Sequence, residues 1–157
     1  DLFLGSEYKL RFEPGRSLIA EAGILVTKVI RNKKNKNKNF IIIDAAMNNL
    51  IRPTLYEAYH KIEPIRKFTG KEIIADIVGP ICETGDFIAL NRKVAEVNND
   101  DLLTIRTTGA YSSVMKSNYN ARVDAIEILI YNGKSYQLKK IDTIMDIISK
   151  ENTIEFI

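Results

Sequence analysis

The sequence predicts a mostly β fold with a few short helices, arranged as a barrel or a sandwich. Short runs of apolar and β-branched residues alternate with turn-forming residues along the chain, which is typical of such folds. Residues 24–30 (ILVTKVI) and 40–43 (FIII) have the composition of two paired strands, and Asn132-Gly133 is the strongest short hairpin signal. The 157 residues favour a single domain with a substantial core.

The first part of the chain combines a strand-helix step with a long hairpin. Residues 9–12 alternate charged and apolar side chains before Glu-Pro-Gly, which predicts a strand that runs into a tight turn. Residues 16–22 favour a helix that ends at Gly23. The hairpin that follows is expected to have a flexible tip rich in lysine and asparagine, over residues 31–39.

The second part predicts further strands between two short helices. A helix is expected to begin at Pro53, because proline is tolerated in a first helical turn. Four runs favour strands: residues 61–66, 71–78, 87–90 and 102–107. Two more strands are expected around Asn132-Gly133: residues 125–131 and 135–139. Asp142 is expected to cap a last helix over residues 143–150.

Charge and hydropathy exclude some classes of partner. The net charge of +3 depends on one basic run, RNKKNKNKN, whose five positive side chains would leave −2 if removed. Between two strands such a run favours a solvated hairpin tip over a phosphate-binding arm, so nucleic acid is not expected as a partner. The sequence has no apolar run near the roughly 18 residues of a membrane-spanning helix and no signal pattern, so we expect a cytoplasmic protein without a membrane partner.

Cys82 is the single cysteine and His60 the single histidine. This count excludes an internal disulfide and the usual zinc ligand sets, so no metal is expected. Cys82 lies in GPICETGD, between turn formers and beside carboxylates, where a nucleophile, a metal ligand, an acid or a small hydrophobe are the alternatives. Nucleophilic catalysis lacks any base other than the distant His60. His60 itself follows the predicted helix and is interpreted as helix-end packing or a solvent-exposed group.

Four polar stretches interrupt the β pattern: EPGR, RPTLY, CETGD and GAY. Each one alone fits a turn, a helix start or a close backbone approach. Together, their order and residues resemble the diaminopimelate decarboxylases, pyridoxal-phosphate enzymes with an alanine-racemase-like fold. The resemblance extends over four longer motifs that cover much of the chain: EPGRSLIAEAGILVTKV, IIDAAMNNLIRPTLYEAYH, GPICETGDF and GAYSSVMKSNYNAR.

The resemblance is to the C-terminal portion of these fold type III decarboxylases. It implies that residues 1–23 are the last strand-helix step of a (β/α)₈ barrel and that residues 24–157 form the C-terminal β domain. In this family the rest of the barrel carries the lysine that binds the cofactor, so the chain alone is expected to be inactive and to require that N-terminal half. The family also implies a homodimer whose active sites are shared between subunits.

The resemblance implies pyridoxal 5′-phosphate as the cofactor, held by Glu13, Gly15, Arg16 and Tyr111. Glu13 would keep the pyridine ring protonated, so that the ring accepts the electrons left when CO₂ departs. Gly15 allows a close backbone approach at a helix start, where the phosphate is expected. Arg16 would lie between cofactor and substrate, and Tyr111 would contact both.

The implied substrate, meso-diaminopimelate, has a second amino-acid head that carries both charges. Arg52 and Tyr56 are expected to bind its distal carboxylate and Glu83 its distal ammonium, while Arg16 and Tyr111 complete the substrate contacts. Cys82 fits a proton donor to the carbanion carbon, since an ordinary thiol, with a pKa of about 8.5, is largely protonated at neutral pH. In the family this cysteine serves the partner subunit's active site.

These expectations predict the C-terminal part of a lyase of lysine biosynthesis, which converts meso-2,6-diaminopimelate to L-lysine and CO₂. The alternative is a non-catalytic remnant or interaction module of a pyridoxal-phosphate decarboxylase. The intact set of motif residues favours the enzyme.

Overall fold

The computed structural model describes residues 5, 7, 9–67, 69–152 and 154. The helices are α1 (Arg16–Ile19), η1 (Ala20–Ala22), α2 (Arg52–Tyr56), η2 (Ser113–Met115), η3 (Tyr119–Ala121) and α3 (Ile144–Ile148), where η marks a 3₁₀ turn. The strands are β1 (Ile24–Lys34), β2 (Asn39–Ile43), β3 (Ile62–Pro64), β4 (Glu72–Val78), β5 (Phe87–Ala95), β6 (Leu102–Arg106), β7 (Ile128–Tyr131) and β8 (Lys134–Gln137).

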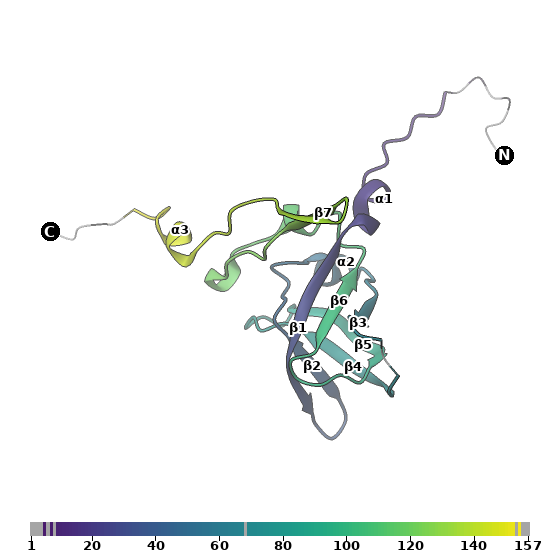
Figure 1. The fold of residues 1–157 in the computed structure, drawn as a ribbon, viewed down its shortest axis with the longest axis vertical. Coiled ribbons are helices and arrows are strands. Elements are labelled where there is room, and N and C mark those ends of the chain that lie inside the picture. Colours follow the sequence, from purple (N-terminus) through teal and green to yellow (C-terminus); the bar gives the residue numbers. More distant parts are fainter. Residues whose placement is uncertain (1–4, 6, 8, 68, 153, 155–157) are drawn as a thin grey trace.

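The main body is one six-stranded sheet that curls into a nearly closed barrel (Figure 1). The strand order is β3-β6-β1-β2-β4-β5. Neighbouring strands are antiparallel except β2 and β4, which are parallel. The edge strands β3 and β5 contact each other, which brings the two ends of the sheet together. The predicted mostly β fold with short helices is therefore confirmed.

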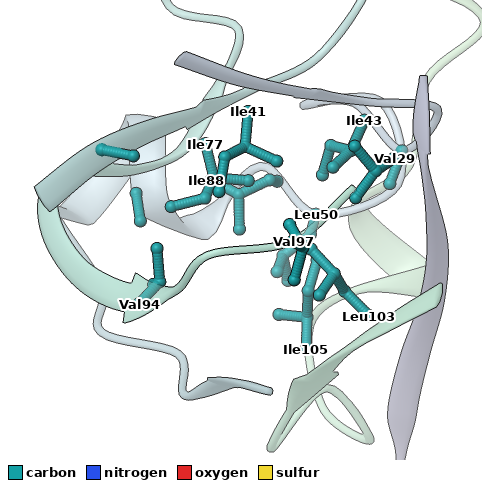
Figure 2. Packing of buried hydrophobic residues seen from close by; sticks show 13 residues of the cluster. Val29, Ile41, Ile43, Leu50, Ile77, Ile88, Val94, Val97, Leu103 and Ile105 are labelled. Carbon is teal, nitrogen blue, oxygen red and sulfur yellow. The ribbon is translucent and has the colours of Figure 1, made fainter. Parts of the chain in front are cut away.

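The core lies inside the barrel, where aliphatic side chains from several strands and from the loop before α2 meet (Figure 2). Period-2 alternation produces it: Ile41 and Ile43 on β2, and Leu103 and Ile105 on β6, are all buried. Each fully buried Ile or Leu contributes about 1.5–3 kcal/mol through removal of apolar surface from water. The labelled core residues are Val29, Ile41, Ile43, Leu50, Ile77, Ile88, Val94, Val97, Leu103 and Ile105.

The basic run is more ordered than the sequence predicts. Residues 31–34 continue β1 and pair with residues 39–42 of β2, so the tip shrinks to residues 35–38. The Lys38 ammonium lies 2.5 Å from the carboxylate of the buried Asp76. Ladder hydrogen bonds override the weak strand propensity of lysine and asparagine here, and one lysine of the run neutralises a buried acid.

Other predicted elements change in extent or identity. Residues 9–12 do not form the predicted strand: they are exposed and have no ladder partner among the described residues. The predicted helix over residues 16–22 is present as α1 followed by η1. The predicted cap Asp142 is wrong, because Thr143 is the N-cap of α3 and forms a capping box with Asp146.

The C-terminal segment, residues 122–150, extends away from the barrel (Figure 1). The Asn132-Gly133 hairpin is confirmed, with β7 and β8 paired from Ile128 opposite Gln137 to Tyr131 opposite Lys134. Every residue of both strands is exposed, so none of the residues that the structure describes covers either face of this hairpin.

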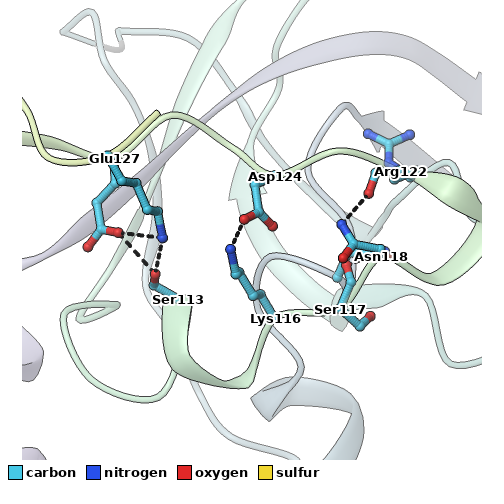
Figure 3. Close-up of polar contacts among 9 residues, drawn as sticks. Ser113, Lys116, Ser117, Asn118, Arg122, Asp124 and Glu127 are labelled. Carbon is cyan, nitrogen blue, oxygen red and sulfur yellow. Dashed lines mark hydrogen bonds and ion pairs between the residues drawn. The ribbon is translucent and has the colours of Figure 1, made fainter. Parts of the chain in front are cut away.

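Polar contacts tie this segment to the preceding residues (Figure 3). The Glu127 carboxylate accepts a hydrogen bond from Ser113 Oγ at 3.0 Å and lies 3.0 Å from Lys139 Nζ. Lys116 and Asp124 form a second ion pair. Polar groups thus replace apolar packing as the attachment of the segment.

Candidate functional site

The loop between β2 and α2, residues 44–51, fixes the start of α2 on the sheet. The buried Thr27 of β1 donates a hydrogen bond to Asp44 Oδ1 at 2.6 Å, and its hydroxyl accepts one from Ala45 N at 3.0 Å. Leu50, at the other end of the loop, is fully buried in the core. Because both ends are anchored, α2 projects from a defined point, and Figure 1 shows it at the same end of the barrel as α1.

The same loop gathers two other motifs. Met47 N donates a hydrogen bond at 2.7 Å to the buried carboxylate of Asp86, the last residue of CETGD. Asn48 is also buried, and its Nδ2 donates at 2.9 Å to the carbonyl oxygens of Ser117 and Tyr119, which follow GAY. The motifs RPTLY, CETGD and GAY are therefore held together by one short loop.

The CETGD turn also contacts α2 directly. Thr54 Oγ1 donates a hydrogen bond to the carbonyl oxygen of Gly85, and Gly85 N donates to Glu83 Oε1 at 3.1 Å. Cys82 and Glu83 are both exposed on this turn. Asp86 thus supports the turn from inside, and the turn presents the thiol and the Glu83 carboxylate outward.

A close backbone approach joins the EPGR end of the chain to GAY. Gly109 N donates a hydrogen bond to the carbonyl oxygen of Ala20 at 2.8 Å, and Thr108 N donates to that of Gly23 at 3.0 Å. A Cβ at Gly109 would overlap the carbonyl oxygen of Ile19, so glycine is required at this crossing. The predicted close approach at Gly109 is confirmed.

Arg52, Tyr56 and Tyr111 form what we call the arginine cluster. The Arg52 ζ carbon lies 5.9 Å from the centroid of the Tyr56 ring and 5.8 Å from that of Tyr111. Gly15 adjoins the cluster, since a Cβ on it would lie 2.8 Å from the Tyr111 hydroxyl oxygen. Tyr111 has a positive φ of 59°, a strained backbone conformation that is often found at functional sites. Three of the four motifs therefore contribute to one surface.

Arg52 has the environment of an anion-binding group. Its residue is only 7% exposed, its Nε has no hydrogen-bond partner, and no carboxylate pairs with it within the described residues. Burial of an unpaired charge costs several kcal/mol, so a buried guanidinium normally has an anionic partner. The guanidinium can supply a planar fork of donors to a carboxylate or a phosphate.

The structure does not bring every predicted site residue to this cluster. Glu13 and Arg16 are exposed at the start of α1. Neither Glu13, Cys82 nor Glu83 has a hydrogen bond or ion pair to the cluster within the part of the chain that the structure describes. The roles assigned to these residues therefore remain predictions.

His60 follows α2 and is a buried residue whose burial the sequence does not reveal. It is 4% exposed, so solvent exposure, one of its two interpretations, is wrong. Burial lowers the pKa of His60, and the positive charges of Arg52, Arg16 and Arg92 lower it further, against a hydrogen bond with the Arg106 carbonyl oxygen that raises it. The available sequence signal was its place in the same motif as Arg52, eight residues further on.

A metal site and a membrane-spanning helix were also searched for among the described residues. The side chains there contain no group of three or more His, Cys, Asp or Glu residues that would hold a metal ion. Likewise, no helix among those residues has the length and apolar character needed to cross a membrane.

Comparison with known proteins gives a consistent family. Residues 16–109 match the family model of the pyridoxal-dependent decarboxylase C-terminal sheet domain. The chain is 46% identical over 153 residues to diaminopimelate decarboxylase of Zymomonas mobilis, covering 98% of this chain and 36% of the relative. The Aquifex aeolicus diaminopimelate decarboxylase is 48% identical over 140 residues, 89% of this chain and 33% of the relative. The chain thus spans about a third of the length of these relatives.

Solved structures agree with this result. The diaminopimelate decarboxylase of M. jannaschii in complex with L-lysine has a TM-score of 0.85 and 35% identity, over 90% of this chain and 32% of that one. The chain is therefore similar to these proteins both in fold and in the local sequence of its motifs.

Proposed function

This chain belongs to the pyridoxal-dependent decarboxylase family, and from that premise we propose that it is the C-terminal part of a diaminopimelate decarboxylase. The whole protein removes CO₂ from meso-diaminopimelate and releases L-lysine, a biosynthetic reaction that we place in the cytoplasm. We infer that an N-terminal part of the whole protein supplies the lysine that binds the cofactor. Residues 1–23 then complete the barrel of that part, and residues 24–157 form the β domain.

The observation that carries the proposal is the buried guanidinium of Arg52, with which no carboxylate of the described residues pairs. A substrate with a single amino-acid head would leave this charge without a partner, whereas the second head of diaminopimelate offers a carboxylate. The ring centroids of Tyr56 and Tyr111 lie 5.9 and 5.8 Å from the ζ carbon of Arg52. Arg52 and Tyr56 thus bind and orient the distal carboxylate, and the exposed Glu83 binds the distal ammonium.

The residues beside the cluster fit pyridoxal 5′-phosphate. A Cβ at Gly15 would lie 2.8 Å from the Tyr111 hydroxyl oxygen, so the glycine allows that hydroxyl to lie against the backbone at the start of α1. Gly15, Arg16 and Tyr111 hold the phosphate end, and Glu13 holds the protonated ring nitrogen. When bound, the cofactor supplies the electron sink for decarboxylation. Arg16 and Tyr111 also contact the substrate and keep it beside the cofactor.

Cys82 holds the proton that is delivered to the substrate carbon after CO₂ leaves. Its thiol is exposed at a turn that Asp86 and Thr54 support, so the Sγ proton is presented outward. In the family that this chain belongs to, this cysteine serves the active site of the partner subunit, and on that basis we assign Cys82 to the active site of a second subunit. A homodimer with shared active sites follows from this assignment.

The test uses the protein that contains this chain together with its N-terminal part. Release of CO₂ and L-lysine from meso-diaminopimelate is expected with added pyridoxal phosphate. Cys82→Ala is expected to lower kcat at least about 100-fold and to leave KM within about threefold, since the thiol acts after binding. The matched control is Cys82→Ser, which keeps a side chain of similar volume. A loss confined to KM would show that the thiol is not the proton donor.

A further inference from the structure

The turn that carries Cys82 and Glu83 is closed by one buried residue, Asp86. Cys82 and Glu83 are exposed, whereas Asp86 is buried. Asp86 Oδ2 accepts a hydrogen bond at 2.6 Å from the backbone N–H of Ile81, the residue before Cys82. Asp86 N donates at 3.0 Å to the carbonyl oxygen of Glu83, and Gly79 N donates at 3.0 Å to that of Asp86. Asp86 therefore fixes the backbone on both sides of the thiol and the Glu83 carboxylate.

The other carboxylate oxygen of Asp86 holds the loop that leads into α2. Oδ1 accepts a hydrogen bond at 2.7 Å from Met47 N, in the loop of residues 44–51. That loop continues directly into Arg52, the first residue of α2. Each oxygen of one carboxylate thus holds a different loop: one carries the proposed proton donor, and the other precedes the proposed site of the distal carboxylate.

The surroundings of the Asp86 side chain fit an acceptor with two oxygens. Both of its partners are backbone N–H groups, and no lysine or arginine forms an ion pair with it among the described residues. Such charge-assisted hydrogen bonds stabilise a buried carboxylate. Gly79 provides the room, since a Cβ on it would overlap the carboxylate oxygens of Asp86. An asparagine amide would instead place its NH₂ group against one of the two N–H donors, which leaves that donor without an acceptor.

We propose that Asp86 is a positioning residue for Cys82 and Glu83: its buried carboxylate holds their turn at a fixed place on the barrel. The proposal rests on the function proposed above, in which Cys82 delivers a proton and Glu83 binds the distal ammonium. Exposed side chains on a turn are not oriented by packing, so their geometry depends on the backbone that carries them. Asp86, buried beneath the turn, acts only through these two residues.

Two variants remove this support in different ways. Asp86→Asn keeps the shape of the side chain and loses one acceptor, whereas Gly79→Ala keeps the carboxylate and displaces it. Both are made in the cofactor-loaded protein that contains this chain and its N-terminal part. Each is expected to lower kcat for meso-diaminopimelate about tenfold through the thiol and to raise KM about fivefold through Glu83, with the cofactor content of the wild type. Wild-type kinetics in both variants would overturn the proposal.

The matched control is Asp76→Asn, at a second buried carboxylate. Asp76 Oδ1 also accepts a backbone hydrogen bond, from Asn91 N at 2.7 Å, but Asp76 lies on β4 and has no hydrogen bond to the turn among the described residues. Asp76→Asn is expected to lower the urea midpoint, as Asp86→Asn does, and to leave kcat and KM within about twofold of the wild type. Equal kinetic losses at Asp76 and Asp86 would reveal a general effect of stability and overturn the positioning role.

Hydrogen exchange of the wild-type protein gives a test that needs no variant. The amides of Met47 and Ile81 donate to the buried carboxylate, so their protection factors should be at least about tenfold higher than that of Thr84, which is exposed on the same turn. Equal protection of the three amides would show that the carboxylate does not hold the two loops, and the proposal would fail.

A double-mutant cycle tests whether Asp86 acts through the thiol. In a Cys82→Ala background, Asp86→Asn is expected to change kcat by less than about twofold, because the group that it positions is absent. An equal tenfold loss in both backgrounds would contradict the role. If the wild-type protein fails to decarboxylate meso-diaminopimelate, the proposed function fails; if it is active and both Asp86→Asn and Gly79→Ala keep its kcat, the positioning role alone fails.

Discussion

The barrel and the C-terminal segment use opposite means of holding their residues in place. In the barrel, side chains such as Ile43, Ile77 and Ile105 are fully buried against one another. In the segment, Ile130 and Tyr131 of β7 are 68% and 62% exposed, and the attachment is polar (Figure 3). The barrel therefore stabilises itself, while the segment has apolar surface that the described part of the chain leaves exposed.

The position of the site follows from this difference. Arg52 and His60 are supported by the loops and strands of the self-stabilised barrel, through Thr27, Leu50 and Arg106. None of these supports belongs to the C-terminal segment. A binding group that must hold a buried charge in a fixed direction gains from a rigid support, and the barrel provides one.

Truncation of a core side chain is expected to give the largest difference in stability between the two regions. Ile77→Ala should lower the free energy of unfolding by about 3 kcal/mol, because it removes buried methyl groups and leaves a cavity. Ile130→Ala makes the same chemical change on the exposed hairpin and should shift that free energy by less than about 0.5 kcal/mol. Urea unfolding of the two variants measures both values. Equal losses would show that the hairpin is packed against the barrel in solution.

A fall in pH from 7.5 to 5.5 is expected to weaken the barrel through His60. The folded-state pKa of His60 is lowered from its ordinary value of 6.5, so below about pH 6.5 the unfolded chain binds a proton that the folded chain does not. Stability is thus fully present above that value and falls as pH decreases toward the folded pKa. His60→Asn removes the only histidine and should flatten the slope in urea titrations at the two pH values. An unchanged slope in the variant would contradict this assignment.

Acid acts on the C-terminal segment in a lower pH window. Hydrogen bonds from Lys139 and Ser113 lower the pKa of Glu127 from its ordinary value of 4.5. Stability from this carboxylate is present above about pH 4.5 and is lost as pH falls through the lowered pKa. The protection factors of the β7 and β8 amides, which correct for the pH dependence of intrinsic exchange, should therefore fall below pH 4.5, and Glu127→Gln should show the lower protection already at pH 6. Loss of barrel protection in the same step would contradict the separation of the two regions.

The smallest effect is expected from the cap of α3. Thr143 Oγ1 accepts a hydrogen bond from Asp146 N at 3.2 Å, and Thr143→Ala removes it. Because α3 is outside the barrel core, the variant should lose amide protection in residues 144–148 only and keep the urea midpoint of the wild type. The control is Thr104→Ala, which makes the same substitution at a threonine of the barrel, on β6. A shift of the midpoint by Thr143→Ala would show that α3 packs on the barrel.

Local sequence patterns predicted the elements whose identity depends on neighbouring residues. β-branched runs predicted β1, β2, β4 and β6, Pro53 predicted α2, and Asn132-Gly133 predicted the last hairpin. The end of β1 was missed because its lysines and asparagines have weak strand propensity and are held by the facing strand. Thr143 replaced Asp142 as a cap because the helix begins one residue later than the sequence indicated.

In the site, too, features that depend on neighbouring residues were predicted, and features that depend on residues far away in the sequence were not. The motifs placed Arg52, Tyr56 and Tyr111 in one functional group, and the structure brings these side chains together. The burial of His60 was not predictable, because its partner Arg106 lies 46 residues away on β6. Likewise, the sequence does not show that no carboxylate of the described residues pairs with Arg52, since that depends on every element around it.

The central claim is that the buried guanidinium of Arg52, which has no carboxylate partner among the described residues, binds the distal carboxylate of diaminopimelate. The most direct measurement is the steady-state kinetics of Arg52→Met in the cofactor-loaded protein that contains this chain and its N-terminal part. KM for meso-diaminopimelate should rise at least about 30-fold, the equivalent of a lost buried ion pair of about 2 kcal/mol, while the cofactor content stays that of the wild type. An unchanged KM, or loss of the cofactor with the substitution, would contradict the claim.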